Sequence, residues 1–233
     1  MQNSSNTKTI LFLINTFSVG GIEKHLSILA PEIAKFEKFK VNIAFMRLED
    51  NSAPSLVPFF SRFKNIEVHD LKIQRLPNIF HLIKALLKIY SLKPQIIHSM
   101  GVRTDLLTLF YSFFDKKVYK IFTIHDTALI AHHRSPLFHF FVNILGNFLY
   151  TKSNINICIS KVIANKMKLI SPRADFNKII NYGITKKELE NKGTNIFFRN
   201  DQLSKIKICL IGRYDLNKNQ ILLAKAIEQC KQN

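Results

Sequence analysis

Short apolar runs alternate with longer segments of helical periodicity along most of this chain of 233 residues. The first run covers residues 9–15 and leads through a loop with Gly20 and Gly21 into a helical segment. Near-continuous apolar strands separated by helices predict a parallel sheet covered on both faces. Right-handed crossovers make such a sheet doubly wound. We therefore expect an α/β domain over residues 1–184.

The expected elements follow from apolar periodicity and from cap and stop signals. Pro31 is expected to kink or break the first helix, and Ser160 can cap the last helix of the domain. Besides the first strand, the pattern predicts strands at 41–47, 66–71, 95–100, 120–126, 155–160 and 178–181. It predicts helices at 22–38, 78–91, 103–114, 136–152 and 161–170.

The carboxyl ends of the expected strands mark the candidate site, because open parallel sheets bind their ligands at this edge. The residues at or just after these strand ends are Gly20, Gly21, His98, Ser99, Gly101, His125, Asp126 and Ser160. This set contains small residues, two histidines and one carboxylate. It is compatible with a bound phosphate or nucleotide.

The Gly20-Gly21 pair is the first candidate in this set. Glycines let the backbone approach an anion, and the helix that begins near Ile22 adds its N-terminal dipole. The spacing is neither GxGxxG nor GxxxxGK, so it indicates neither a standard dinucleotide fold nor a P-loop NTPase. A tight turn without a ligand is the alternative.

His125 and Asp126 stand together at a strand end. Adjacent residues of an extended strand point to opposite faces, so these two cannot form a stacked catalytic pair. One of them can line a cleft while the other orients a loop. Structural histidines are the alternative both here and at His98. The sequence contains no G-x-S-x-G elbow and no convincing carboxylate pair.

A second strand-to-glycine unit begins at residues 206–211 and leads into Gly212-Arg213 with Lys218 downstream. The two cations could clamp a diphosphate, and a tight turn with solvated cations is the alternative. Only residues 220–233 follow Asn219. We expect 206–233 to be the first βα unit of an incomplete second domain, after a polar linker at 185–205, so that the chain is truncated.

The formal net charge of +18 predicts attraction to polyanions. A solvated basic surface is the plain interpretation. Attraction to an anionic membrane is the alternative. It is supported by the apolar segments 79–90 and 136–150 if they are membrane-surface helices rather than core helices of the domain. Nucleic acid is not expected, because no recognisable binding motif is present. The sequence contains no run of 18 apolar residues that would indicate a membrane span. The three cysteines are widely spaced, so they indicate neither a zinc site nor a disulfide framework and fit a reducing cytosol.

Six segments, taken in order, resemble motifs of the family 4 glycosyltransferases. They are FSVGGIEKHLSILAPEIAK, LKPQIIHSM, IFTIHD, INICISKVIANKM, KIINYGI and ICLIGRYDLNKNQILLAKAI. The first is similar to the family's Gly-Gly-x-Glu loop, the second to its KPDIIH strand and the third to its T-x-HD strand end. The last is similar to VGRLxxxKG…LIxA, which opens the family's C-terminal domain. These segments cover almost the whole chain.

The resemblance implies the GT-B architecture, in which two Rossmann-like domains face each other across a cleft. It implies that Gly20 and Gly21 lie beside the donor phosphates and that Arg213 and Lys218 hold the diphosphate. His125 matches the family histidine near the transferred sugar, which makes it the candidate catalytic residue. Glu23, His98 and Asp126 are candidates for the acceptor side. Family members retain the sugar's configuration and need no metal, so no cofactor is expected.

The resemblance therefore implies transfer of a hexose from a UDP- or GDP-sugar to an envelope glycan or a lipid-linked acceptor, as in polysaccharide or lipopolysaccharide biosynthesis. From the cysteines, the charge and the apolar segments we expect a cytoplasmic protein, peripheral on the inner face of the cytoplasmic membrane. The family's paired C-terminal glutamates have no counterpart in residues 206–233, and Asn219 replaces the usual glycine. We expect this chain alone to be inactive. The alternative is a non-catalytic subunit that binds a separate donor-domain chain or a membrane.

Overall fold

The computed structural model describes residues 7–17, 20–47, 55–73, 78–125, 136–183, 208–210 and 219–232, without the side chains of 136–142 and 231–232. The chain divides into two compact units, Met1–Thr185 and Lys186–Asn233. The expected elements of the first domain fall in the first unit.

The first unit is built on a parallel sheet of seven strands, counted over the described residues, in the order β3-β2-β1-β4-β5-β6-β7. The strands are β1 (Lys8–Thr16), β2 (Phe39–Arg47), β3 (Ile66–Asp70), β4 (Ile96–Met100), β5 (Tyr119–Ile124), β6 (Ile155–Cys158) and β7 (Lys178–Ile179). This confirms the predicted doubly wound α/β sheet. The strand order reverses between β1 and β4, which is where such sheets open a crevice for ligands.

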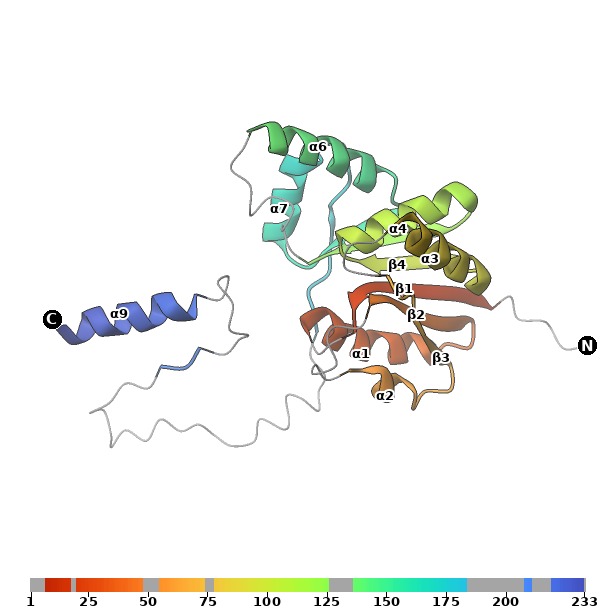
Figure 1. Ribbon diagram of the computed structural model, residues 1–233, viewed down its shortest axis with the longest axis horizontal. Coiled ribbons are helices and arrows are strands. Elements are labelled where there is room, and N and C mark those ends of the chain that lie inside the picture. Colours follow the sequence, from red (N-terminus) through yellow and green to blue (C-terminus); the bar gives the residue numbers. More distant parts are fainter. Residues whose placement is uncertain are drawn as a thin grey trace, which may run out of the picture. The chain divides into compact units, whose positions relative to one another are not determined.

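Helices cover both faces of the sheet (Figure 1). Helices α1 (Gly21–Ala34) and α2 (Val57–Phe60) lie on one side. On the other side lie α3 (Ile79–Leu92), α4 (Val102–Phe114), α6 (Pro136–Thr151) and α7 (Lys161–Ile170). In the described part of the chain no helix is long and apolar enough to cross a membrane.

Strand β1 shows why the sheet is stable. Its central residues are fully buried and alternate between the two faces. Phe12 and Ile14 pack into the cluster that contains Leu26 of α1. Leu11 and Leu13 pack into the cluster formed with α3 and α4. A third cluster, further along the sheet, joins β5 and β6 to α6 and α7. A run that is apolar at every position is therefore what this central strand requires.

Helix α1 runs through Pro31 without a break and ends at Ala34. Of the predicted kink or break, the break is therefore excluded, and the predicted end at residue 38 was wrong. Leu26, Ala30 and Ala34 are buried on its inner face. Packing of this face against the sheet outweighs the single backbone hydrogen bond that proline removes.

Helix caps follow the predictions more closely. The Ser160 hydroxyl accepts a hydrogen bond from the backbone N–H of Ile163 at 3.2 Å, which confirms the predicted cap of α7. The Asn78 side chain accepts from the backbone N–H of His81 at 3.0 Å and caps α3. These caps fix where the two helices begin.

The second unit is described at residues 208–210 and in helix α9 (Gln220–Gln232). Residues 208–210 form no strand, in contrast to the strand predicted at 206–211. A strand needs a paired neighbour, and the described residues of this unit contain none. The linker at 185–205, Arg213 and Lys218 lie outside the described residues, so the predicted domain boundaries stay a prediction.

Candidate functional site

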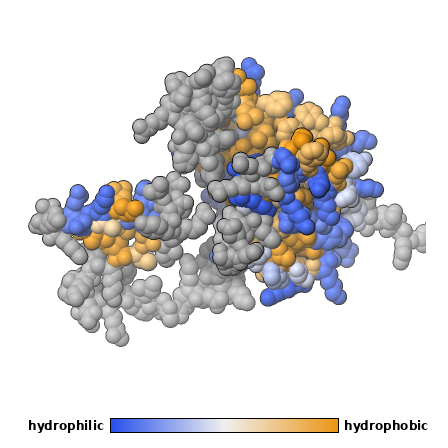
Figure 2. Space-filling model, in the orientation of Figure 1, coloured by the Kyte–Doolittle hydropathy of each residue, from blue (hydrophilic) through white to orange (hydrophobic). Residues whose placement is uncertain are grey.

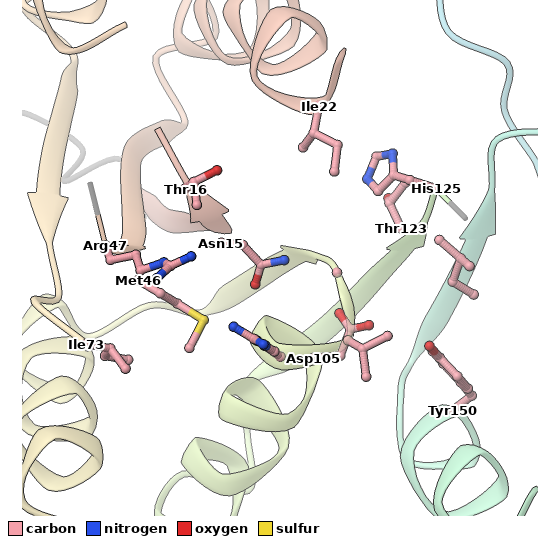
Figure 3. A pocket seen from close by; sticks show the side chains of 14 residues that line it. Asn15, Thr16, Ile22, Met46, Arg47, Ile73, Asp105, Thr123, His125 and Tyr150 are labelled. Carbon is pink, nitrogen blue, oxygen red and sulfur yellow. The ribbon is translucent and has the colours of Figure 1, made fainter. Parts of the chain in front are cut away.

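A cavity of about 410 Å³ lies at the carboxyl ends of β1, β2, β4 and β5, at the point where the strand order reverses. Ile22 reaches it from the start of α1, and Asp105 faces it from α4 (Figure 3). Arg47 and His125 stand on opposite sides of it (Figure 3). The remaining lining residues are Asn15, Thr16, Met46, Ile73, Gly101, Val102, Arg103, Thr123, Ile124 and Tyr150. The structure thus has a cavity at the edge where the sequence predicts a site.

His125 directly follows β5 and lines this cavity. Its Nδ1 is hydrogen-bonded to the hydroxyl of Tyr182. Burial lowers the pKa of His125 to about 4, and the nearby His25 adds a smaller effect in the same direction. The imidazole is therefore neutral at pH 7. A neutral imidazole can exchange hydrogen bonds with a sugar hydroxyl without carrying a charge of its own.

Tyr182 joins two elements that are far apart in the sequence. It lies three residues beyond β7, and its ring stacks on the ring of His25 in α1, with centroids 3.8 Å apart and an interplanar angle of 14°. Its ring centroid lies 5.4 Å from that of His125. Sequence analysis did not single out this residue. The available signal was its place just after the last strand of the sheet, at the carboxyl edge.

The two glycines before α1 differ in their surroundings. Gly20 is the N-cap of α1, and a Cβ there would lie 2.4 Å from Oε2 of Glu23. Glu23 is almost fully buried, and the Thr16 hydroxyl donates to its Oε1 at 3.2 Å. The close approach of Glu23 therefore explains why position 20 is a glycine. A Cβ on the exposed Gly21 would meet nothing within 4 Å, so no contact among the described residues requires glycine there.

His98 is buried in β4, beneath the cavity rather than in its lining. Its Nε2 lies 2.6 Å from the hydroxyl of Thr123, which does line the cavity, and its ring packs against Phe12. Burial, followed by the charges of His125 and His25, lowers the pKa of His98 to about 3. His98 is therefore a neutral core histidine that supports a lining residue.

Asp105 contributes a carboxyl group that is held without charge. Ser99 donates a hydrogen bond to its Oδ1 at 2.5 Å, and the residue is buried in the first turns of α4. Burial raises the pKa of Asp105 to about 8, against the smaller opposing effect of the Ser99 hydrogen bond. At pH 7 this carboxyl is mostly protonated. Arg47 and Arg103 then give the cavity a net positive charge.

Gly101 shapes the floor of the cavity between β4 and α4. Its φ of +136° is a conformation that side chains rarely adopt, and a Cβ there would lie 2.8 Å from Nδ2 of Asn15. The Oδ1 atom of Asn15 is buried, and in the described part of the chain it has no hydrogen-bond partner. Asn15 is therefore one of the few lining residues with a buried polar atom that the described residues leave unsatisfied.

The structure therefore brings His125 and the start of α1 to one cavity, with His98 just below it and Glu23 beside Gly20. Asp126, Arg213 and Lys218 lie outside the described residues. Within the described ranges, no group of three His, Cys, Asp or Glu side chains could hold a metal ion. Cys158 is buried, and burial raises its pKa to about 11; a thiol of this kind is not an activated nucleophile.

Comparisons with known proteins give one family and several distant structures. The family model described as Glycosyltransferase Family 4 matches residues 19–175. No curated protein sequence matches the chain significantly.

Among solved structures, the chain is similar to the lipopolysaccharide outer core galactosyltransferase WaaB in its apo form, with 15% identity and a TM-score of 0.49, over 70% of this chain and 42% of that one. It is similar to UDP-GlcNAc 2-epimerase from Neisseria meningitidis bound to UDP-GlcNAc, with 14% identity and a TM-score of 0.47, over 74% and 46%. It is also similar to a UGT transferase from Siraitia grosvenorii in complex with UDP, with 10% identity and a TM-score of 0.40, over 79% and 54%. The chain thus spans about half or less of each.

Proposed function

The chain belongs to glycosyltransferase family 4, and from this membership we propose that it takes part in moving a hexose from a UDP- or GDP-sugar to a glycan or lipid-linked acceptor of the cell envelope. One observation carries the proposal. The neutral His125 and the start of α1 line one positively charged cavity at the switch point of the sheet. A sugar nucleotide combines the hydroxyls and phosphates that such a cavity can bind.

On the donor side, we assign the phosphates to the backbone at Gly20 and Gly21. The first N–H groups of α1 have no partner within the helix, and they sit at the positive end of its dipole. Gly21 leaves open space where any other residue would place a side chain, so a phosphate can come close to the backbone. Arg213 and Lys218 complete the diphosphate site in this proposal, through their resemblance to the family's basic pair.

At the transferred sugar, we assign His125 a hydrogen-bonding role. Bond cleavage leaves negative charge on the departing nucleoside diphosphate, and cations and backbone N–H groups stabilise that charge without a metal ion. A neutral His125 can form a hydrogen bond with a sugar hydroxyl. Arg213, Lys218 and the start of α1 then stabilise the negative charge of the departing nucleoside diphosphate. The proposed transfer retains the configuration of the sugar.

On the acceptor side, the cavity offers hydrogen-bonding groups rather than a strong base. Asp105 is mostly protonated at pH 7, and the Asn15 side chain lines the same cavity. Glu23 acts through Thr16 and Gly20 in this proposal, His98 acts through Thr123, and Asp126 belongs to the same side.

We also propose that the 233-residue chain alone transfers no sugar and binds nucleotide weakly. In the GT-B architecture a second domain supplies most of the donor site, and electrostatic stabilisation is strong only in a closed cleft without water. In this proposal transfer requires a donor-binding domain, which the same protein or a separate chain can supply. The place of action in this proposal is the cytoplasm, at the inner face of the cytoplasmic membrane.

The test measures binding of UDP-hexoses and GDP-hexoses to the purified full chain by calorimetry or NMR. Gly21→Ala is expected to weaken binding of the better donor by about tenfold, because a methyl group intrudes on the phosphate. The helix itself favours alanine, so stability should not fall. Gly183→Ala is the matched control, since a Cβ there also meets nothing within 4 Å. Equal effects of the two substitutions would contradict the assignment of Gly21.

A turnover assay tests the catalytic part separately. Donor hydrolysis and sugar transfer are measured for the purified chain and for His125→Ala. No turnover is expected from the chain alone. Turnover that His125→Ala abolishes would support the role of His125 and refute the proposed inactivity. Turnover that survives His125→Ala would refute the role of His125.

A further inference from the structure

Two arginines line the cavity, and the proposed donor site uses neither of them. Arg47 ends β2 and is half-buried, and Arg103 is exposed in the first turn of α4. We call these two residues the arginine pair. Figure 3 shows Arg47 across the cavity from His125. The donor phosphates are assigned to the start of α1 with Arg213 and Lys218, which leaves the arginine pair without a role.

The arginine pair is not neutralised by any described residue. Neither guanidinium forms an ion pair with a described carboxylate. Asp105 lines the same cavity, but its carboxyl group accepts a hydrogen bond from Ser99 and is mostly protonated at pH 7. Two like charges that face one cavity of about 410 Å³ repel each other unless an anion lies near both.

The position of Arg103 does not favour the helix to which it belongs. Helix α4 begins at Val102, so Arg103 is its second residue. A helix carries a partial positive charge at its start, and a cation there gains no stability from the helix dipole. The Arg103 side chain is also exposed. A residue that breaks a local rule without a structural gain is expected at a functional site.

The arginine pair lies away from the place assigned to the transferred sugar. Strands β1 and β4 separate β2 from β5 in the sheet. Neighbouring strands lie about 4.8 Å apart, so the backbones of Arg47 and His125 are about 14 Å apart across the cavity. The two residues therefore contact different parts of the bound substrates. With His125 at the transferred sugar, the arginine pair faces the space that remains for the acceptor.

We infer that the arginine pair binds an anionic group, a phosphate or a carboxylate, carried by the acceptor sugar. This inference rests on the proposed function, because it takes the donor phosphates to lie at the start of α1. A guanidinium presents paired N–H donors in a plane, which match two oxygens of a phosphate or a carboxylate. Met46 and Ile73 are buried and line the cavity near Arg47 (Figure 3). Such apolar surroundings strengthen a charged hydrogen bond.

The test compares sugars that differ in charge, namely methyl glucoside, glucuronate and glucose 6-phosphate. Their binding to the full chain is followed by NMR at constant ionic strength. We expect the charged sugars to bind at least about tenfold more tightly than methyl glucoside, because hydrogen bonds to charged groups are the stronger ones. The tighter of the two charged sugars identifies the anionic group as a carboxylate or a phosphate. Inorganic phosphate is the probe for the anion alone and should bind more weakly than glucose 6-phosphate.

Substitutions then locate the binding. Arg47→Gln and Arg103→Gln should each weaken binding of the tighter charged sugar by about tenfold and leave methyl glucoside unaffected. Arg62→Gln is the matched control, since Arg62 is exposed after α2 and does not line the cavity. Arg103→Gln should leave the urea midpoint of unfolding unchanged or raise it, because it removes a cation from the start of a helix.

A crossed comparison separates this inference from the proposed function. Gly21→Ala should weaken binding of the UDP- or GDP-hexose and not of the charged sugar, whereas Arg47→Gln should do the reverse. Binding of charged sugars without any binding of nucleotide sugars would support the anionic subsite and refute the proposed donor site. Binding of nucleotide sugars without binding of charged sugars would refute the anionic subsite alone.

Three results would overturn the inference. The first is equal binding of methyl glucoside and the charged sugars, or an equal loss of binding in Arg62→Gln. The second is binding of inorganic phosphate as tight as that of glucose 6-phosphate, which would mean a contact with any anion rather than an acceptor subsite. The third is a loss of nucleotide-sugar binding in Arg47→Gln and Arg103→Gln as large as the loss of charged-sugar binding. That outcome would assign the arginine pair to the donor phosphates.

Discussion

Two surfaces depart from ordinary protein surfaces in opposite ways. One is the carboxyl edge of the sheet, and the other is the outer apolar face, which consists of the exposed apolar side chains of α3, α4 and α6. Figure 2 shows hydrophobic side chains gathered over α3 and α4. At the carboxyl edge, polar groups such as Asp105, His98 and Thr123 are buried and hydrogen-bonded to one another or to neighbours. On the outer apolar face, large side chains such as Phe113 and Phe114 are exposed. Buried polar groups and exposed apolar patches are the informative exceptions in a folded protein.

The comparison teaches that folding alone explains neither region. A buried carboxyl costs stability unless it is protonated or paired, and an exposed phenylalanine gains little from folding. Local departures of this kind concentrate where a chain meets its ligands or partners. The two regions are also made differently, because the first is assembled from loops after several strands and the second from surfaces of three helices.

The largest expected effect separates the two sides of one helix. Ile89 of α3 is fully buried, whereas Ile83 of the same helix is 45% exposed. Ile89→Ala should lower the free energy of unfolding by about 2–5 kcal/mol, since it leaves a cavity in the core. Ile83→Ala should change it by less than about 0.5 kcal/mol. Urea unfolding of both variants measures this, and similar losses would mean that the outer apolar face is part of the core.

The second effect concerns the uncharged carboxyl at the carboxyl edge. The pKa of Asp105 is raised to about 8 in the folded protein, so the folded state holds a proton that the unfolded chain releases above its ordinary pKa near 4. Stability therefore falls as the pH rises from about 4 to about 8. Asp105→Asn keeps an acceptor for Ser99 and removes this loss. We expect it to stabilise the protein at pH 8 by at most about 5 kcal/mol, because each pKa unit between about 4 and about 8 corresponds to about 1.4 kcal/mol.

Urea unfolding at pH 4, 6 and 8 tests this expectation. The gain from Asp105→Asn should shrink towards pH 4, where the carboxyl is protonated in both states. A gain of the same size at every pH would show that Asp105 does not titrate as described. Ser99→Ala is a useful companion, because it removes the hydrogen bond and leaves the carboxyl in place.

The smallest effect sharpens the description of His125. Tyr182 covers this histidine and hydrogen-bonds its ring, and burial lowers the pKa of His125 to about 4. Tyr182→Ala should admit water and raise that pKa by about 1 unit or more, equal to about 1.4 kcal/mol. Tyr182→Phe should raise it less, because the ring still covers the histidine. NMR titration of the His125 ring measures both, and an unchanged pKa in Tyr182→Ala would show that other groups bury it.

Much of the fold could be predicted from the sequence, because strands such as β1 have a continuous apolar centre, at residues 10–14, and are separated by segments of helical periodicity. The rule that ligands bind at strand exits led to His125 and to Gly20-Gly21, both of which lie at the predicted edge. The strand predicted at 206–211 is absent from 208–210, since strand formation depends on a neighbour rather than on the residues alone.

The rest depends on how elements orient in space. Tyr182 meets His125 across 57 positions of sequence, and no local pattern specifies that contact. Asp105 lies in the first turns of a helix, where a carboxylate is usually solvated, and its burial follows from the placement of α4 against Ser99. Helices apolar on several sides do not reveal from sequence which side meets the sheet. The outer apolar face could therefore be suspected in α3 and α6 but not mapped.

The most direct test of the central claim is to follow the Gly21 amide and the His125 ring by NMR while a UDP- or GDP-sugar is added to the full chain. The proposed donor site predicts weak, saturable shifts at these two positions and at lining residues of the cavity such as Thr16 and Ile22. Gly21→Ala should weaken them, and Gly183→Ala should not. Saturable shifts confined to other parts of the chain, or the absence of any shift at high donor concentration, would contradict a donor site at the carboxyl edge.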